Sequence, residues 1–506
     1  MDYYDSATKV SCSTRGAAPT GPDMDTTTIR HRFRQRRTLF LALGVLLLLV
    51  ATAGVGAAHQ GRRGSKRVAL AGGEAGLENT EPSTTSAPTT GPVPTTIATP
   101  STTAAPATSS PATAQATTAP ATTAPTTAAA RAAGPTFYVA TDGNDGNPGS
   151  AEAPWRSLSA SIARLVAGDT LYVRGGSYAA VLDEQFDIEG KNGSAGAWIT
   201  IAAYPAERPV VQLNSNWQGF YVNNSSYVEI RGFEIVGTAL SDQRMTDGVE
   251  VKKSHHVKVL RNVVHDVGGC GICGIESNHV RIEGNEVYGA SKWNTYQTSA
   301  ISFFLSANIG GGNNSDGFSM YVSGNRVHDN TNIAPPGPGQ KVTDGNCIIV
   351  DYNDDNGYLG STLIQNNLCY ENGGRGVHVF YAKNVLAVNN TLVNNLRHPD
   401  IDGGELTASS SSALVYRNNL TVASRPGAGA VVWSAQVEFD HNVHVGQAPA
   451  QLGNGDQVTS VSVNADFTPA ASSPAINGGS TVLAPATDIR GVLRDAQADV
   501  GAFEAT

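Results

Sequence analysis

The chain of 506 residues carries 34 Lys and Arg against 43 Asp and Glu, and only 15% of its residues are charged. The charge is uneven: residues 1–134 hold twelve basic and seven acidic residues, which leaves 22 against 36, a net charge of −14, in residues 135–506. So acidic a C-terminal part argues against a nucleic-acid-binding domain, because phosphates are bound by clustered basic side chains. Five cysteines are too few for a disulfide-built scaffold of this size.

Residues 1–37 form a basic tail, and the uncharged segment TLFLALGVLLLLVATAGVGAA follows it at 38–58. A helix needs about 20 apolar residues to cross a bilayer, so this segment predicts one transmembrane helix that acts as a signal anchor. The arginines before it favour a cytoplasmic N-terminus. We therefore expect a single-pass cell-membrane protein with an extracellular C-terminal domain. A signal peptide cleaved near residues 55–58 is the alternative interpretation.

Residues 59–134 form a linker that is rich in Thr, Ala, Pro and Ser. Between 80 and 130 the linker has no apolar periodicity and almost no charge, so it cannot bury a core. We expect it to be disordered and to hold the domain at 135–506 away from the membrane.

The domain opens with a short helical pattern. SLSASIARLV (157–166) has helical apolar spacing and lies just before the first strand, LYVRGG. A helix at this point would cover the first strands and block edge-to-edge pairing, so we expect an N-terminal capping helix.

An eight-residue phrase then recurs, with apolar residues at positions 1, 3 and 8 and usually Asn at position 6. Copies include VRIEGNEV at Val280 and ALVYRNNL at Ala413, and the base period is 23 to 24 residues. Each copy is typical of a strand, a bend and a second strand. Such a coil buries its apolar face only by stacking, so the sequence predicts an all-β, parallel β-helix solenoid. The asparagines expected to form a ladder inside the bends are Asn262, Asn285, Asn325, Asn367, Asn390, Asn418 and Asn442.

Two intervals between copies exceed the base period, by about 17 and about 19 residues. The additional residues fall in 306–317, and in 332–345 together with 351–360. Insertions in a solenoid map to loops, often on the binding face, so we expect the middle coils to build walls around a groove.

The two ends of the domain carry a family resemblance. FYVATDGNDGNPGSAEAPWRSLSASIARLVAGDTLYVRGGSY (137–178) resembles the opening of secreted right-handed β-helix proteins of the pectate lyase superfamily. SPAINGG (473–479), DIRG (488–491) and DVGAFE (499–504) resemble the terminal module of bacterial surface β-helix proteins. The resemblance implies a right-handed parallel β-helix over 135–506. It does not fix the chemistry, because the superfamily holds lyases, hydrolases, epimerases and non-catalytic surface proteins.

Acidic residues concentrate in DGNCIIVDYNDDNG (344–357). Carboxylates this close repel one another unless a cation lies among them, and hard oxygen ligands suit calcium. The Asp-rich loop resembles the calcium sites of β-helix pectate lyases, and a solvated acidic loop is the alternative. The predicted calcium ligands are Asp344, Asp351, Asp354 and Asp355.

The next coil brings basic side chains beside this loop. When the strand starts are paired, Ile349 lies beside His378, and Arg375 lies close by. β-Elimination of a uronate needs a cation for the substrate carboxylate and a base for the adjacent proton. We therefore predict His378, Arg375 and Lys383 as catalytic residues. A hydrogen-bonded structural histidine, and an ion pair of Arg375 with Glu371, are the alternatives.

Four residues are predicted to bind substrate. Trp293 and Tyr296 can stack on sugar rings. Arg397 and Glu405 add charged groups on the coil that follows His378.

Two cysteines form the motif Cys270-Gly-Ile-Cys273. Outside the cell and without a second pair, we expect a disulfide or two free thiols rather than a zinc site. Cys369 occupies an apolar position of its repeat and is expected in the core.

Together these features predict a cell-surface, carbohydrate-active protein, a calcium-assisted polysaccharide lyase acting on an acidic, uronate-containing polysaccharide. A non-catalytic glycan-binding or adhesive surface β-helix is the alternative, and a glycoside hydrolase is a further one. The expected partners are a polysaccharide and, through the N-terminal helix, a membrane. Nucleic acid is not an expected partner, and we expect a monomer.

Overall fold

The computed structural model describes residues 134–505 apart from 181–184, 214–217, 239–242, 316 and 355. The predicted basic tail, the transmembrane helix at 38–58 and the linker up to residue 133 lie outside the described residues. Within the described part, no helix is both long and apolar enough to cross a bilayer.

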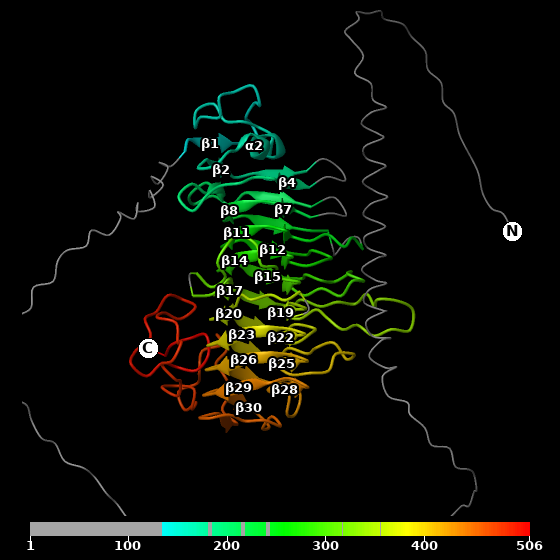
Figure 1. Ribbon diagram of the computed structural model, residues 1–506, viewed down its shortest axis with the longest axis vertical. Coiled ribbons are helices and arrows are strands. Elements are labelled where there is room, and N and C mark those ends of the chain that lie inside the picture. Colours follow the sequence, from blue (N-terminus) through cyan, green and yellow to red (C-terminus); the bar gives the residue numbers. More distant parts are fainter. Residues whose placement is uncertain are drawn as a thin grey trace, which may run out of the picture. The chain divides into compact units, whose positions relative to one another are not determined.

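The described chain winds through three parallel sheets, with one strand of each sheet in all but the terminal coils, and the coils stack along one axis (Figure 1). Sheet A contains β1 (Thr136–Val139), β2 (Thr170–Val173), β5 (Ile199–Ala203), β8 (Ser226–Arg231), β11 (His255–Leu260), β14 (Asn278–Glu283), β17 (Met320–Ser323), β20 (Thr362–Gln365), β23 (Lys383–Val388), β26 (Ser412–Arg417) and β29 (Val437–Asp440). Sheet B contains β3 (Ser177–Ala179), β6 (Val210–Gln212), β9 (Glu234–Val236), β12 (Val263–His265), β15 (Glu286–Tyr288), β18 (Arg326–His328), β21 (Leu368–Tyr370), β24 (Thr391–Val393), β27 (Leu420–Val422), β30 (Val443–Val445) and β31 (Gln457–Thr459). Sheet C contains β4 (Phe186–Glu189), β7 (Phe220–Asn223), β10 (Val249–Lys252), β13 (Ile272–Ile275), β16 (Ile301–Phe304), β19 (Ile348–Asp351), β22 (Val377–Phe380), β25 (Leu406–Ser409) and β28 (Ala430–Trp433).

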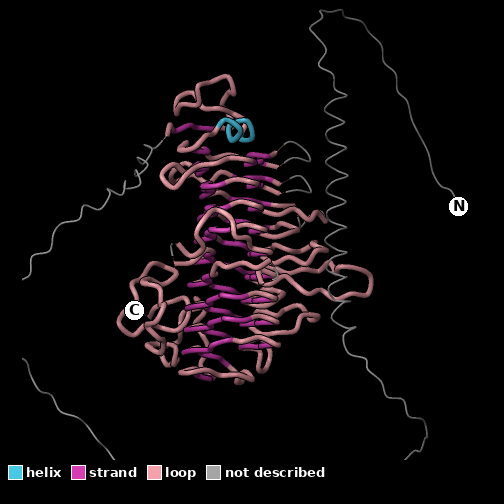
Figure 2. The backbone as a smooth tube through the Cα atoms, in the orientation of Figure 1, coloured by secondary structure: helices cyan, strands magenta, loops and turns pink. Residues whose placement is uncertain are grey.

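The helix expected at the start of the domain is α2 (Leu158–Arg164). Its N-cap is Ser157, whose hydroxyl accepts from the backbone N–H of Ala160 at 3.2 Å. Leu158 and Ile162 are buried against the first coils, and the helix lies beside β2 and β4 (Figure 2). The predicted capping helix is confirmed.

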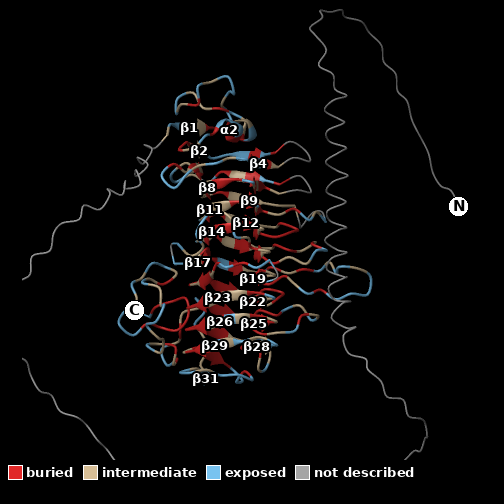
Figure 3. Cartoon of the chain, viewed as in Figure 1, coloured by how far each residue is buried: buried red, intermediate tan, exposed pale blue. Residues whose placement is uncertain are grey.

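The core follows from strand alternation. In β11, Val257 and Val259 are fully buried, and they pair in register with Val280 and Ile282 of β14 on the next coil. Side chains two apart on a strand share a face, so each strand sends one set inward and the other outward. The inward sets of all three sheets form one continuous apolar cluster (Figure 3). The polar residues between them face outward and supply the chemistry of the surface.

A ladder of buried asparagines lines the bend between sheets A and B. Asn325 donates from its backbone N–H and its Nδ2 to Oδ1 of Asn367 at 3.0 and 2.9 Å. The amide of Asn367 in turn donates to the carbonyl of Val322 at 2.9 Å. Each rung therefore satisfies a buried polar group of the neighbouring coil. The members are Asn262, Asn285, Asn325, Asn367, Asn390, Asn419 and Asn442, and Asp456 accepts from the last.

The predicted ladder is confirmed except at one rung, where Asn419 replaces Asn418. Val385 pairs with Leu414, so the phrase begins at Leu414 rather than at Ala413. The residue before each rung adopts positive φ, at 53° for Asn418 and 53° for Asn389, a conformation that asparagine tolerates well. The sequence NN thus holds two different roles, a bend residue followed by a rung.

A second ladder, which the sequence did not predict, lines the bend between sheets B and C. Asn330 donates to Asn372, and Asn372 donates to Asn395, each by backbone N–H and side-chain amide. Glu405 terminates the series, because its carboxylate accepts from the backbone N–H of Asn395 at 3.0 Å and from its Nδ2 at 2.5 Å. These asparagines follow the first ladder by five residues, so the signal was present in the sequence.

The C-terminal segment folds back along the side of the solenoid, next to the bend between sheets A and B (Figure 1). It docks on the positive-φ asparagines of three successive coils. Asn366 donates to the carbonyl of Thr487, and Asn389 donates to that of Asp499. Ala502 and Phe503 also pack on Leu368. The motifs at 488–491 and 499–504 therefore cover the side of the stack.

Four cysteines form two disulfides in the described part of the chain. Cys270 is bonded to Cys273, which settles the choice between a disulfide and free thiols. Cys347 and Cys369, 22 residues apart, are both buried and bonded to each other. Cys369 is therefore in the core as predicted, and it also links one coil to the next.

The buried ladder gives a stability prediction. Asn367→Ala removes the acceptor of two bonds, so the backbone N–H of Asn325 and one of its two amide hydrogens lose their partner in the core. The other amide hydrogen still bonds the carbonyl of Ile282. We expect a loss of about 3 kcal/mol of unfolding free energy, measured by urea denaturation. Asn223→Ala, at an outward-facing position of β7, is the control and should cost less than about 0.5 kcal/mol. Equal losses of unfolding free energy in both variants would show that the asparagine ladder does not stabilise the domain.

Candidate active site on sheet C

The predicted catalytic residues meet on the outward face of sheet C. Ser302, Ile349, His378 and Thr407 form one outward row on β16, β19, β22 and β25, in register across four coils. Asp351 and Phe380 form the next row. The pairing of Ile349 with His378 predicted from the sequence is confirmed.

His378 is the centre of this face. Its side chain is buried, and among the described residues neither Nδ1 nor Nε2 has a hydrogen-bond partner. Burial and the nearby positive charge of Arg375 hold the pKa of the imidazole well below its ordinary value, so the ring is neutral. An unsatisfied buried polar group costs about 1–3 kcal/mol, and such a cost is found where a ligand supplies the missing partner.

Arg375 precedes β22 and turns its guanidinium towards the loop before β19. Its Nη1 donates to the carbonyl of Thr343 at 3.0 Å, and its backbone N–H donates to Oδ1 of Asn346 at 2.8 Å. Its Nε is buried without a partner in the described part of the chain. Gly403, with φ +134°, backs this group, because a Cβ there would lie 2.7 Å from Nε of Arg375. The ion pair with Glu371 that the sequence allowed is made by Arg397 instead.

Asp344 is held by hydrogen bonds from its own loop. Thr343 donates to Oδ2 at 2.7 Å, and the amide of Asn346 donates to Oδ1 at 2.8 Å. Burial nevertheless raises the pKa of Asp344, although these bonds and the charge of Arg375 oppose the shift.

Asp351, at the end of β19, is the less satisfied carboxylate. Its Oδ1 is buried with no partner among the described residues. Burial, reinforced by the negative charge of Asp344, raises the pKa of Asp351 well above its ordinary value. Asp344 and Asp351 are therefore close enough to repel each other.

Asp354 and Lys383 form a pair of their own at the bend between sheets C and A. Nζ of Lys383 lies 2.6 Å from Oδ1 of Asp354. Asn353 fixes this bend, because it donates to the carbonyl of Lys383 and accepts from its N–H. An ammonium group engaged in this pair is not poised as a base, so we do not place Lys383 with His378.

The described carboxylates do not fit the predicted calcium site. Asp354 is neutralised by Lys383, and the oxygens of Asp344 already accept hydrogen bonds. Asp355 lies outside the described residues. In the part of the chain that the structure describes, no three His, Cys, Asp or Glu side chains gather in a way that could hold a metal ion. Calcium takes six to eight oxygen ligands, so we derive no step through it.

The predicted substrate-binding residues are dispersed. Tyr296 is 72% exposed and lies beside Gln297. Oε1 of Gln297 accepts from the N–H of Thr343, and the carbonyl of Thr343 accepts from Arg375, so Tyr296 lies near the loop that holds Arg375. Trp293 is half-buried on the same loop. Arg397 pairs with Glu371 at the bend between sheets B and C.

Glu405 corrects the prediction that it binds substrate. It is fully buried at the end of the second asparagine ladder, where both its oxygens accept from Asn395. Burial raises its pKa to about 8. A polysaccharide cannot reach this side chain while the coil is folded.

Sequence reasoning missed two acidic residues farther up sheet C. Asp247 and Glu250, in TDGVEV (246–251), lie before and on β10. Burial and the charge of Glu250 raise the pKa of Asp247 to about 8. Burial also raises the pKa of Glu250, against the opposing charge of Lys252. The strand alternation, which turns Glu250 outward, was the available signal.

Known proteins place this geometry in context. Residues 137–376 match the family model described as Pel9A-like, right handed beta helix region. Pectate lyase L of Paenibacillus polymyxa is 28% identical over 248 residues, 47% of this chain and 49% of that protein. Pectate lyase PEL9 of Emericella nidulans is 34% identical over 74 residues, 15% of this chain and 17% of that protein. The chain thus spans about half or less of the length of these curated relatives.

Among solved structures, pectate lyase Pel9A superposes with a TM-score of 0.45 and 18% identity, covering 73% of this chain and 96% of that one. The family model agrees with the resemblance of the motif at 137–178. The described domain is a parallel β-helix, and its residues 137–376 are similar to the Pel9A-like right-handed β-helix region.

Glu405 gives a pH prediction. Its pKa rises from about 4.5 in the unfolded chain to about 8 when folded, so the folded state binds the extra proton. The stabilisation of the fold that comes from protonated Glu405 is fully present below about pH 4.5, and it is lost as the pH rises to about 8. Glu405→Gln, whose Oε1 can accept both Asn395 bonds, should lack this loss. As the pH rises from about 4.5 to about 8, we expect the unfolding free energy of the parent to fall relative to that of the variant, measured by urea denaturation. A difference that does not change with pH would contradict a raised pKa.

Proposed function

We propose that the domain is a polysaccharide lyase that cleaves an acidic, uronate-containing polysaccharide by β-elimination on the outer face of sheet C. The observation that carries this proposal is His378, a neutral imidazole with neither ring nitrogen satisfied among the described residues, next to Arg375. The uncharged segment at 38–58 supports, as part of the same proposal, an extracellular domain anchored at the cell surface.

The chemistry requires a base and a cation. The lone pair of His378 takes the proton from the carbon beside the uronate carboxylate. The electrons of that C–H bond form a carbon–carbon double bond as the neighbouring C–O bond to the next sugar breaks, and the departing oxygen gains a proton from water. The guanidinium of Arg375 binds the carboxylate and stabilises the charge that develops there. The depressed pKa of His378 keeps it in the acceptor form at neutral pH.

We infer that access to His378 depends on Arg375. Both ring nitrogens are shielded from solvent, and the guanidinium is held by single bonds to Thr343 and Asn346. A substrate carboxylate offers Arg375 a stronger, bidentate partner than these neutral acceptors. We infer that substrate draws the guanidinium outward and opens the path to the imidazole.

The relatives support the substrate class. Two curated proteins that match the chain are named pectate lyases, and the family model takes its name from Pel9A. Pectate is a polymer of uronates, which is the substrate that the Arg375 and His378 pair suits.

Glycoside hydrolysis is a second candidate, favoured by Asp247 and Glu250. Burial and the charge of Glu250 raise the pKa of Asp247 to about 8, as in sites where one acid stays protonated while the other is ionised. Substitution of Asp247 and Glu250 would abolish hydrolase activity and would leave lyase activity at His378 unchanged.

The test of the lyase uses the ultraviolet absorbance of the unsaturated uronide product on pectate. His378→Leu should reduce activity by at least about a hundredfold, the usual contribution of a general base. Because it also removes an unsatisfied buried imidazole, it should keep or raise the unfolding free energy, by about 1 kcal/mol. A variant that loses stability in step with activity would show a structural histidine.

The matched control is His444→Leu. His444 is equally buried, but its Nδ1 pairs with Oγ1 of Thr421 at 2.8 Å. Its replacement should cost stability and leave the activity of the folded protein unchanged. The assay is run with added calcium and with a chelator. Activity that survives the chelator is expected, and activity that requires calcium would mean that the metal site predicted from the sequence forms with substrate.

A further inference from the structure

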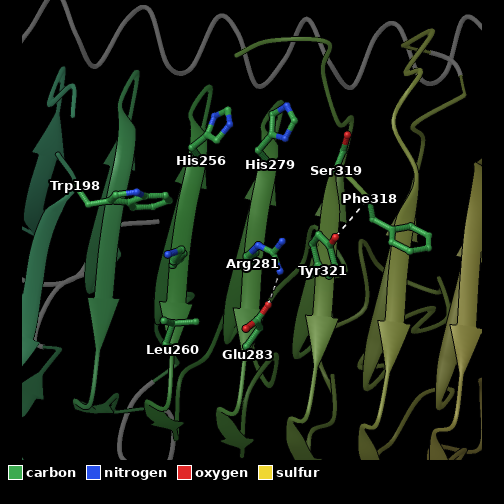
Figure 4. Close-up of a pocket in the computed structure, with 10 residues that line it drawn as sticks. Trp198, His256, Leu260, His279, Arg281, Glu283, Phe318, Ser319 and Tyr321 are labelled. Atoms are coloured by element: carbon green, nitrogen blue, oxygen red, sulfur yellow. Dashed lines mark hydrogen bonds and ion pairs between the residues drawn. The ribbon is translucent and has the colours of Figure 1, made fainter. Parts of the chain in front are cut away.

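A pocket of about 400 Å³ lies on the outward face of sheet A, away from the candidate active site. Figure 4 shows its lining residues on successive parallel strands, with Trp198 at one end and Phe318 at the other. Lys258 and Arg281 occupy paired positions on β11 and β14 in the middle. Sheets A and C turn their inward faces to one core, so their outward faces are separate surfaces.

The pocket is bordered by rings. Trp198 packs edge-on against Tyr227 at 5.3 Å, and His256 stacks on Tyr227 at 4.4 Å between ring centroids. At the far side Phe318 packs edge-on against Tyr321 at 5.8 Å. Partly exposed aromatic rings with fixed orientations offer apolar faces for the C–H faces of sugars.

The middle of the pocket is cationic. Nζ of Lys258 lies 4.0 Å from the ring centroid of Trp198, and the guanidinium carbon of Arg281 lies 3.7 Å from that of Tyr321. Their side chains stay 32% and 31% exposed. Each cation is thus oriented by a ring and retains donors for a further acceptor.

Acidic neighbours limit the charge. Glu229 lies 3.7 Å from Lys258, and Glu283 lies 3.1 Å from Arg281. The surface therefore suits isolated carboxylates better than a dense polyphosphate.

The spacing fits a chain of sugars. Adjacent coils are roughly 4.8 Å apart, so the lining from the coil of Trp198 to that of Tyr321 spans roughly 19 Å along the axis. One coil corresponds closely to one residue of an extended polysaccharide, so rings and cations recur at the repeat of the ligand. Phe318 and Ser319, which directly follow the predicted insert at 306–317, also line this pocket.

We propose that this face of sheet A is a second glycan-binding site, which holds an acidic oligosaccharide through Trp198, Lys258 and Arg281. It does not depend on chemistry at His378. It would bind one stretch of a long polysaccharide while another stretch lies on sheet C.

The test measures binding of an oligogalacturonate to the full chain by titration calorimetry, with its methyl ester as the neutral control. Trp198→Ala and Arg281→Gln should each weaken binding about tenfold or more, and the ester should bind more weakly than the acid. Every titration is run on chains that also carry His378→Leu, so that the proposed lyase does not cleave the ligand during the measurement. Circular dichroism checks that each variant is folded.

Three results would overturn the proposal. One is parent-like binding by both sheet A variants when folded. Another is equal binding of the acid and its ester, which would exclude selection by charge. The third is no binding by the chain that carries His378→Leu alone, which would exclude an oligosaccharide site on sheet A. If the protein does not cleave pectate but still binds the oligogalacturonate through Trp198, the proposed function is wrong and the binding site on sheet A is supported.

Discussion

The whole domain depends on the fact that one coil cannot satisfy its own interior. A single turn of this chain exposes an apolar face and leaves the amides of its bends unpaired, so both must be completed by the turns before and after it. The asparagine of each bend connects both neighbouring coils. Asn367, for example, accepts from Asn325 of the preceding coil and donates to Asn390 of the following coil. Since a coil without a neighbour is unstable, the register of every strand is inherited from the strand beside it.

That inherited register also places the chemistry. Residues that face outward at the same strand position become neighbours across coils, although 29 residues separate Ile349 from His378 in the chain. The face of sheet C collects His378 and Asp351 in this way, with Arg375 just before β22, and the face of sheet A collects Lys258 and Arg281. The same stacking rule therefore serves both faces, and the identity of the outward side chains alone decides what each can bind.

Periodic features could be predicted from the sequence and irregular ones could not. The recurring phrase predicted the fold and six of the seven asparagine rungs, and it failed at Asn418 because two asparagines in succession hide the register. The pairing of Ile349 with His378 followed from the same regularity. The acidic loop at 344–357 did not repeat, so the pairing of Asp354 with Lys383 could not be predicted from the pattern. The segment before β25 did not repeat either, and there Glu405 turns inward and ends a ladder. The coupling of Asp247 with Glu250 depends on burial, which spacing does not report.

The returning C-terminal segment changes how the stack as a whole behaves. In an open solenoid each turn contacts only the adjacent turns, so the last one can peel away and the rest can follow in order. Here the backbone near Thr487 and Asp499 is bonded to Asn366 and Asn389, across sequence separations of 121 and 110 residues. These contacts raise the contact order of the final third of the chain, which slows its folding. They also fasten three turns to one another, so that part of the molecule is expected to melt as one cooperative block rather than unravel from its end.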